Sequence, residues 1–390
     1  MGYDVTLKNR LFFYFMLMSA GIITAEKVSS AVPEATIADT NQQIKTPSAT
    51  LVQKPNRRSR EEVQALIEHA GKTKPDWWDS VSLSYPDTLD LNYPNPANRK
   101  WNPKKNVGQY MWGIINENAK RFRQGTKFMH YVYSLNKDDP EVTRRTTQQL
   151  GHCYHDLLQD WARAAYWLRK ANNRGVKLAN AYWQLGSKEM AEEILRPIKS
   201  DYTKHGAIIK LWSDMGELET ALKLANRSQD PRNRGGLSRA AGDALQRHGR
   251  FDEALVYYQK VLDIGGRYMP AFLNKNEVLK LNQNHAKAAI ESIRIFAMFD
   301  VSRLRDGSFT DSALGYSGAV QVNTTVKSHR IESVKVIKHK EQQYYSSLID
   351  MPEQILRKQD IRNIDATTGA TVTADAIRIA TAKALQQARE

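Results

Sequence analysis

A recurring pattern of small residues between residues 139 and 300 constrains the fold of this chain more than any other feature. Its clearest copy consists of Gly242, Leu245, Gly249, Ala254, Tyr258 and Val261, with Gly266 closing the unit. Small residues at fixed offsets let two helices cross closely, and the larger residues fill the adjoining space. The segment starts at Asp139-Pro140, which is typical of a helix N-cap followed by proline at the first helical position. The pattern therefore predicts paired helices up to about Phe299.

Further copies of this pattern occur on both sides of the clearest one. They are found at Gly151, Tyr154, Ala164, Leu168 and Ala171, at Gly186 and Ala191, at Gly216 and Ala221, and at Ala288 and Ile290. From Ala221 onward the repeat length is 33 and then 34 residues, whereas the two preceding units span 30 and 27 residues. The array resembles tetratricopeptide repeats with shortened units at its N-terminal end. The resemblance implies either a concave groove for a partner peptide or domain, or a rigid spacer, since stacked helix pairs serve both purposes.

Length and charge limit the classes of protein that remain. The chain has 390 residues, enough for two or three domains, and 41% of them are apolar and 25% charged, as in ordinary globular proteins. Its 57 basic and 42 acidic residues give a net charge of +15, which suits nucleic acid, anionic lipid or acidic partner proteins. The basic residues are dispersed, and the sequence has no helix-turn-helix, RNA-recognition or zinc-finger pattern, so we expect no nucleic-acid partner.

Cys153 is the single cysteine of the chain. One thiol cannot form an internal disulfide, a four-thiolate iron–sulfur site or the C-x-x-C-H attachment of a c-type haem. His152 and His155 lie one helical turn apart, as metal ligands can, but ligands from one helix rarely complete a site. We expect no metal here, solvent-facing histidines and a buried thiol. Any electron carrier in this protein should then be organic.

Residues 1–25 are typical of an export signal. Lys8 and Arg10 precede an apolar run from Leu11 to Ile23, which is too short for a comfortable membrane span, and Ala25 supplies a small residue for cleavage. Residues 26–58 are rich in Ser, Thr, Ala, Pro and Gln, which predicts a flexible spacer. The signal is either cleaved or kept as a membrane anchor. Both alternatives place the folded part outside the cytosol, in the periplasm or at the cell surface.

Residues 59–138 are expected to form a helical and aromatic N-terminal region. Ser59 and Glu62 have the spacing of a capping box at the start of a helix. The segment Trp77–Pro103 is rich in aromatic residues and proline. We expect it to be irregular and to wrap around the helices that follow, although an aromatic stretch can also bind a ligand.

The apolar periodicity changes after Asp300. Alternate valines predict a strand within 316–326, β-branched residues predict a second strand over 331–338, and the short connection between them predicts a hairpin. An amphipathic helix is expected from Met351 to about Lys358. A last helix is expected from about Thr373, with one face buried through Ile377, Ala380, Ala384 and Ala388. Two strands and two helices indicate a small α+β domain over 305–390.

A loop of small residues directly precedes the last helix, with the sequence Asp365-Ala366-Thr367-Thr368-Gly369-Ala370-Thr371-Val372-Thr373-Ala374. Gly369 and Ala370 let the backbone approach a ligand closely, and the N–H groups and dipole of the next helical turn favour a phosphate. The threonine hydroxyls add donors, and one of them could accept a phosphoryl group. Threonines ahead of a helix are, however, usually ordinary N-caps.

This loop resembles the flavinylation motif of the FMN-binding domain found in subunits of sodium-translocating NADH:quinone reductase and the Rnf complex. That motif runs Asp, two variable residues, Ser or Thr, Gly, Ala, Thr, two variable residues and Ser or Thr, and Asp365 and Thr368–Thr371 match it. Three upstream stretches also resemble the family, namely Asp306-Gly307-Ser308-Phe309, Gly315-Tyr316-Ser317-Gly318 and Lys338-His339-Lys340-Glu341. The resemblance extends from Asp306 to the end of the sequence.

The resemblance implies a role for each residue of the loop. Thr371 would carry FMN as a phosphoester, formed by a flavin transferase that uses FAD and Mg²⁺. Asp365 would position the loop or assist the transfer, and Thr368 completes the match. Gly369 and Ala370 would leave room for the phosphate and the transferase.

Two further implications concern the surroundings of the loop. Gly315 and Tyr316 are expected to lie near the isoalloxazine ring. The motif ends in a hydroxyl residue, whereas this sequence has Ala374 there, and Thr373 beside it is the residue that could compensate.

The expected fold class is multidomain, with an all-α tetratricopeptide-like array at 139–300 followed by a small α+β FMN-binding domain. The resemblance implies an extracytosolic flavoprotein that transfers electrons between redox partner proteins docked on the repeats, and an electron carrier more than a stand-alone enzyme. The alternative is a repeat-based adapter whose C-terminal domain carries no flavin.

Overall fold

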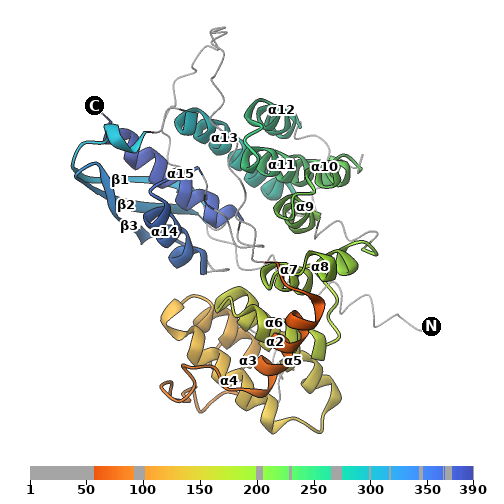
Figure 1. Cartoon of the computed structure of the whole chain (residues 1–390). Helices are drawn as coiled ribbons and strands as arrows, with labels where there is room; N and C mark the ends of the chain where they lie inside the picture. The colour runs from red at the N-terminus through yellow and green to blue at the C-terminus, as the bar shows by residue number, and fades with distance from the viewer. Residues whose placement is uncertain are drawn as a thin grey trace.

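The computed structural model of the chain describes residues 57–91, 102–198, 205–227, 231–264, 275–297, 300–315, 318–341, 346–362, 364 and 371–389. Helices fill the structure as far as residue 297, and a small sheet with two helices follows (Figure 1). The expected export signal lies outside the described residues, as does almost all of the expected spacer. Within the described part of the chain, no helix is both long and apolar enough to cross a membrane.

The N-terminal region starts with helix α2 (Arg60–Lys72), which begins at the expected capping box. The hydroxyl of Ser59 accepts a hydrogen bond from the N–H of Glu62 at 3.2 Å, and the Glu62 carboxylate accepts one from the N–H of Ser59 at 2.6 Å. Val63 and Ile67 are fully buried, and α2 packs against α6 (Trp161–Lys170). A segment far upstream in the sequence thus forms a wall of the helical array.

The aromatic stretch is irregular where it is described and packs against helix α4 (Phe122–Leu135). The ring of Tyr85 lies 4.9 Å from that of Phe128, and the ring of Trp78 lies 4.9 Å from that of His130. The described part of this stretch therefore packs on the helices as expected and covers an apolar core. The remaining elements here are the helix α3 (Val107–Tyr110), the π-helix η1 (Met111–Ile115) and the 3-10 helix η2 (Ala119–Arg121).

The middle of the chain is a stack of helix pairs that ends in one long helix (Figure 1). The pairs consist of α5 (Pro140–His152) with α6, α7 (Val176–Gln184) with α8 (Lys188–Leu195), α9 (His205–Asp214) with α10 (Leu218–Asn226), and α11 (Pro231–Arg247) with α12 (Phe251–Leu262). Helix α13 (Lys275–Ala297) packs against α11 and α12. As expected, Asp139 caps α5 and Pro140 is its first residue.

The recurring glycines of the sequence pattern serve two different purposes. Gly186, Gly216 and Gly249 follow the first helix of three pairs with φ of 99°, 84° and 72°, a left-handed conformation that only glycine adopts readily. Gly242 instead lies inside α11, where a Cβ atom would be 2.6 Å from the ring of Tyr258 on α12. The first kind ends a helix, and the second lets two helices cross closely. Gly266 lies outside the described residues.

The C-terminal domain contains an antiparallel sheet in the order β1-β2-β3. Its strands are β1 (Gly307–Leu314), β2 (Ala319–Lys327) and β3 (Arg330–Lys338), and a short 3-10 helix, η5 (Val301–Arg303), precedes them. Ser328 and His329 join β2 to β3 with φ of 50° and 56°, which confirms the expected hairpin. The expectation of two strands was wrong. Strand β1 was missed because only Ala313 of its residues is buried, so no apolar alternation marks it.

Helices α14 (Ser346–Lys358) and α15 (Thr371–Gln387) complete this domain. Helix α15 packs on β1 and β2 and also contacts α13 and α14. It is buried on more than one face, since Ala376, Ile379 and Ala382 are covered as fully as the expected Ile377 and Ala380. Ile295 of α13 belongs to the same apolar core. The last helix of the array and the sheet domain are therefore packed together.

Candidate functional site

Helix α15 begins at Thr371, so the expected acceptor threonine is its first residue. This start is two residues earlier than the expected start near Thr373. The first N–H groups of a helix have no partner within it, and the helix dipole adds a partial positive charge there. Position 371 therefore lies where the backbone favours an anion. Asp365, Thr368, Gly369 and Ala370 lie outside the described residues, as do Tyr316 and the side chain of Thr371.

Glu341 joins the first turn of α15 to the sheet. This residue is 3% exposed, and its Oε2 accepts a hydrogen bond from the hydroxyl of Thr373, which is also buried. A charged acceptor makes such a bond stronger than one between neutral groups. This hydrogen bond holds the segment after β3 against the first turn of α15, which includes Thr371.

Gly315 completes this contact from the end of β1. A Cβ atom at position 315 would lie 2.5 Å from Glu341 Oε1 and 2.8 Å from Cγ2 of the buried Val320. The N–H of Gly315 donates to the carbonyl of Gly318 at 2.7 Å, which closes the turn into β2. A side chain at position 315 would therefore displace the carboxyl group of Glu341 from its present place.

The structure thus brings three parts of the sequence together at the start of α15. Glu341 lies against both Gly315 and Thr373, and Thr371 begins the same helical turn as Thr373. The expectation that Gly315 lies near the isoalloxazine ring stays a prediction. We call the group Gly315, Glu341 and Thr373 the carboxylate clamp.

Comparison with protein families identifies this part of the chain. Residues 315–386 match the family model of the FMN-binding domain. The match starts at Gly315 of the carboxylate clamp and includes β2, β3, α14, the loop before α15 and α15 itself as far as residue 386. No curated protein and no solved structure matches the chain. The match indicates a flavoprotein.

Glu341 is the residue of the FMN-binding domain that the sequence analysis did not single out as a site residue. The only signal was the resemblance of Lys338-His339-Lys340-Glu341 to a family stretch. Its role depends on contacts with Gly315 and Thr373, which are 26 and 32 positions away in the sequence. No local pattern could reveal those contacts.

The two residues at the end of the motif have different environments. Ala374 is fully buried in the apolar core of the FMN-binding domain. A hydroxyl there would need a polar partner among apolar neighbours, which costs free energy when none is present. Thr373 is buried too, but its hydroxyl is bonded to Glu341. In this chain the hydroxyl of Thr373 therefore holds the helix start in place.

A buried polar network lies one helical turn after Thr371. Asp375 pairs with Arg378 at 2.9 Å, and its other oxygen is 3.6 Å from Nε2 of His285 on α13. Burial is the main cause that lowers the pKa of His285, and Arg239 acts in the same direction. Asp375, Arg378 and His285 are all buried. The network connects the FMN-binding domain to the helical array.

The region around Cys153 is structural. The expectation that both histidines face solvent was wrong for His155, which is fully buried. Its ring can be buried because it is hydrogen-bonded to Asp156 at 2.7 Å and to Asn180 at 3.1 Å. Burial raises the pKa of the Cys153 thiol to about 12, so the thiol stays protonated. Among the residues that the structure describes, no group of three or more His, Cys, Asp or Glu side chains could hold a metal ion.

Proposed function

We propose that this protein is an extracytosolic electron carrier with FMN esterified to Thr371. The observation that carries the proposal is the match of residues 315–386 to the FMN-binding domain together with the position of Thr371 as the first residue of α15. When bound, FMN supplies one- and two-electron chemistry, and the protein controls its position and surroundings. Covalent attachment suits a compartment without a pool of free cofactor, because it fixes the local concentration of the cofactor.

The residues at the start of α15 fit a phosphoester. The dipole and first N–H groups of a helix of 17 residues favour its negative charge. Gly369 and Ala370 supply the small side chains that close approach of a phosphate requires. The carboxylate clamp fixes the first turn of the helix, which keeps the backbone at Thr371 in one position. Asp365 and Thr368 complete the motif that a flavin transferase would recognise.

Attachment would proceed by transfer from FAD on the transferase. The hydroxyl oxygen of Thr371 forms a bond to the phosphorus of the FMN half, the pyrophosphate bond breaks, and AMP leaves. The hydroxyl proton passes to the transferase or to solvent. The protein supplies the hydroxyl and holds the loop; the transferase and its Mg²⁺ supply the activation.

The helical array is the part proposed to dock redox partners. Its stacked pairs offer an extended surface of the kind that repeat proteins use for binding. The export signal expected at residues 1–25 would place the chain in the periplasm or at the cell surface, with the membrane nearby if the signal is retained.

Intact mass spectrometry tests the proposal directly. The protein should be produced with its export signal in cells that also produce a flavin transferase, and the exported protein should then be denatured. We expect a mass increase of one FMN less one water. Thr371→Ala should abolish the increase, whereas Thr371→Ser, which keeps a hydroxyl, and Thr373→Ser, which changes the neighbouring threonine, should retain it. An unmodified wild-type mass, or a modified Thr371→Ala protein, would refute the proposal.

A further inference from the structure

The sheet of the FMN-binding domain has one face packed against helices and one face with exposed side chains. Helices α14 and α15 pack on the sheet, and the buried Val322 belongs to the core between them. Paired residues on neighbouring strands share a face of a sheet, so Thr310 of β1, Asn323 of β2 and Lys335 of β3 lie together on the opposite face. Thr310 and Lys335 are exposed there. The second face is therefore open to solvent.

Two exposed aliphatic side chains lie at the end of the sheet that meets the start of α15. Leu314 is the last residue of β1 and is 39% exposed, and Ile337 lies near the end of β3 and is 52% exposed. Both are close in sequence to the carboxylate clamp, since Gly315 follows Leu314 and Glu341 lies four positions after Ile337. Ile337 is also unpaired at a register shift between β2 and β3, a distortion that re-aims side chains. Exposed apolar surface therefore borders the proposed flavin position.

Three lysines lie at the same end of the sheet. Lys335 and Lys338 are on β3 on either side of Ile337, and Lys340 follows the strand. All three are exposed, and none of them forms an ion pair within the part of the chain that the structure describes. The exposed carboxylate of β3 belongs to Glu332, which lies beside the hairpin at the other end of the strand. We call Leu314, Ile337, Lys335, Lys338 and Lys340 the lysine face.

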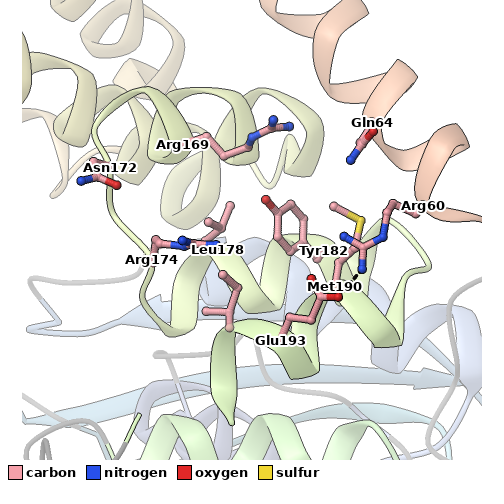
Figure 2. Close-up of a pocket in the computed structure, with 10 residues that line it drawn as sticks. Arg60, Gln64, Arg169, Asn172, Arg174, Leu178, Tyr182, Met190 and Glu193 are labelled. Atoms are coloured by element: carbon pink, nitrogen blue, oxygen red, sulfur yellow. Dashed lines mark hydrogen bonds and ion pairs between the residues drawn. The ribbon is translucent and has the colours of Figure 1, made fainter. Parts of the chain in front are cut away.

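The pocket of about 280 Å³ in the helical array differs from the lysine face in both respects. Leu178 and Ile194 of its apolar lining are buried, so they offer no free apolar surface. Figure 2 shows Arg60 paired with Glu193 at this pocket. Its charged lining residues are Arg60, Arg169, Arg174 and Glu193. On the lysine face the aliphatic side chains are exposed and the cations are unpaired, as a docking surface requires.

We propose that the lysine face docks an acidic electron-transfer protein whose redox centre lies behind a small apolar patch with carboxylates at its rim. The inference rests on the proposed function, because a carrier with FMN at Thr371 needs a partner surface beside that residue. Protein interfaces combine an apolar centre with a polar rim, and those of electron carriers are small. Complementary charges at the rim raise the association rate and select the partner. A partner held by the array can meet this surface in a fixed relation, because α13 packs in both parts of the molecule.

An acidic protein fits this surface better than nucleic acid, lipid or a second copy of the chain. Against a sugar–phosphate chain, Leu314 and Ile337 would gain no burial in an apolar environment. Thr310 and Asn323 make the neighbouring strip of the sheet polar, with a hydrogen bond of 2.9 Å between them, so this strip would not enter the apolar layer of a membrane. A second copy would bring like charges together, since the net charge of the chain is +15.

Titration of the full-length protein with a plant-type ferredoxin, a small acidic one-electron carrier, tests the proposal by calorimetry. We expect binding at low salt that weakens as salt is added. The triple variant Lys335→Gln/Lys338→Gln/Lys340→Gln should bind on the order of tenfold more weakly. Carbodiimide cross-linking, which joins lysine amines to carboxylates, should connect the ferredoxin to these lysines in the wild-type protein. All three lysines are exposed, so the fold should be retained, which circular dichroism checks.

The matched control is Lys72→Gln/Lys120→Gln/Lys223→Gln, which removes the same charge from exposed lysines of the helical part and should bind like the wild type. Ile337→Thr should weaken binding several-fold, whereas Val256→Thr on α12, at a position that is 55% exposed, should not. Equal weakening in both triple variants would show that net charge alone drives binding and would overturn the proposal. Absence of binding at low salt, cross-links confined to the array, or stronger binding through the same lysines to phosphatidylglycerol vesicles would overturn it as well.

Docking on the lysine face does not require the flavin. Protein produced without the transferase should therefore bind the ferredoxin as the modified protein does. The intact mass of each sample then separates the two proposals. A protein that carries FMN but does not dock would overturn only the docking inference, and a protein that docks but is never modified would refute only the flavin attachment.

Discussion

Gly315, Glu341 and Thr373 come from the ends of two strands and the first turn of a helix, and a single buried carboxylate connects them. Glu341 restricts the residue at each of the other two positions. Glycine at 315 leaves room for the carboxylate, and threonine at 373 satisfies one of its oxygens. At the scale of single residues, this clamp is the part of the FMN-binding domain that positions the start of α15.

Gly315→Ala should destabilise the C-terminal domain by about 1–3 kcal/mol, the usual cost of overpacking a filled site. The added Cβ would meet Glu341 Oε1 at 2.5 Å and Val320 Cγ2 at 2.8 Å, so the carboxylate must leave Thr373. Hydrogen exchange measured by mass spectrometry should show faster exchange in α15. The control is Gly206→Ala on α9, where the nearest atom is 4.0 Å away. Unchanged exchange in α15 of Gly315→Ala would contradict the clamp.

At the scale of elements, the contact between α13 and α15 joins the helical array to the FMN-binding domain. On its buried side Asp375 of α15 pairs with Arg378 of the same helix and faces His285 of α13, and on its more exposed side Lys383 of α15 pairs with Glu291 of α13 at 3.0 Å. Removing one partner of a buried pair leaves an uncompensated charge, whereas an exposed pair contributes little. We therefore expect the buried pair of Asp375 and Arg378 to contribute more to stability than the pair of Lys383 and Glu291.

Asp375→Ala should lower the free energy of unfolding by roughly 3 kcal/mol, because the buried Arg378 loses the carboxylate that it pairs with at 2.9 Å. Glu291→Ala, across the same two helices, should cost less than about 1 kcal/mol. Urea unfolding followed by circular dichroism measures both values. Equal losses of unfolding free energy in the two variants would show that the buried pair contributes no more to stability than the exposed pair.

Helix α4 contributes a pH dependence through His130. Burial, with a smaller effect of Arg163, lowers the pKa of His130 from its ordinary value of 6.5 to about 4. Between pH 6.5 and about pH 4, His130 is therefore protonated in the unfolded chain and neutral in the folded chain. The stability from neutral His130 is therefore complete above pH 6.5 and decreases as the pH falls towards 4, by about 1.4 kcal/mol per pH unit at most.

His130→Gln should reduce this slope between pH 6.5 and 4. His69→Gln, which changes an exposed histidine on α2, should leave it unchanged. Urea unfolding at a series of pH values, followed by tryptophan fluorescence, measures the slope. All eight tryptophans precede residue 213, so the signal reports on the helical part of the chain. A slope that is the same in wild type and His130→Gln would contradict the assignment.

At the scale of the whole molecule, α13 belongs to two cores. It packs against α11 and α12 of the array, and its Ile295 is buried in the core of the FMN-binding domain. A flexible connection would let the two parts move independently, but a shared helix couples them. Partners bound to the array would thus meet the FMN-binding domain in a fixed relation.

A fragment of residues 300–390 should be less stable than a fragment of residues 275–390. Loss of α13 exposes the apolar surface that Ile295 covers and removes the acidic partner of Lys383. Burial of one aliphatic side chain contributes about 1.5–3 kcal/mol, so the difference should be at least of that order. Urea midpoints by circular dichroism give the comparison, and equal midpoints would show that the domain does not need α13.

Features fixed by neighbouring residues could be predicted from the sequence. The capping box at Ser59, the Asp139-Pro140 helix start and the hairpin at Ser328 depend on residues within one turn, so their signals are local. The loop before α15 was recognisable for the same reason. Features that depend on distant partners could not be predicted, namely strand β1, the burial of His155 and the role of Glu341.

The sequence alone determined that helix pairs precede a small α+β domain, and that the loop before its last helix resembles a flavin-attachment motif, because periodicity, caps and motif spacing are properties of contiguous residues. Only the tertiary structure decided that Glu341 lies between Gly315 and Thr373, that α13 is shared by two cores, and that Arg169 and Arg174 face one pocket with α2. These arrangements join residues tens to more than a hundred positions apart. The packing of whole elements fixes such contacts, and no stretch of sequence encodes them by itself.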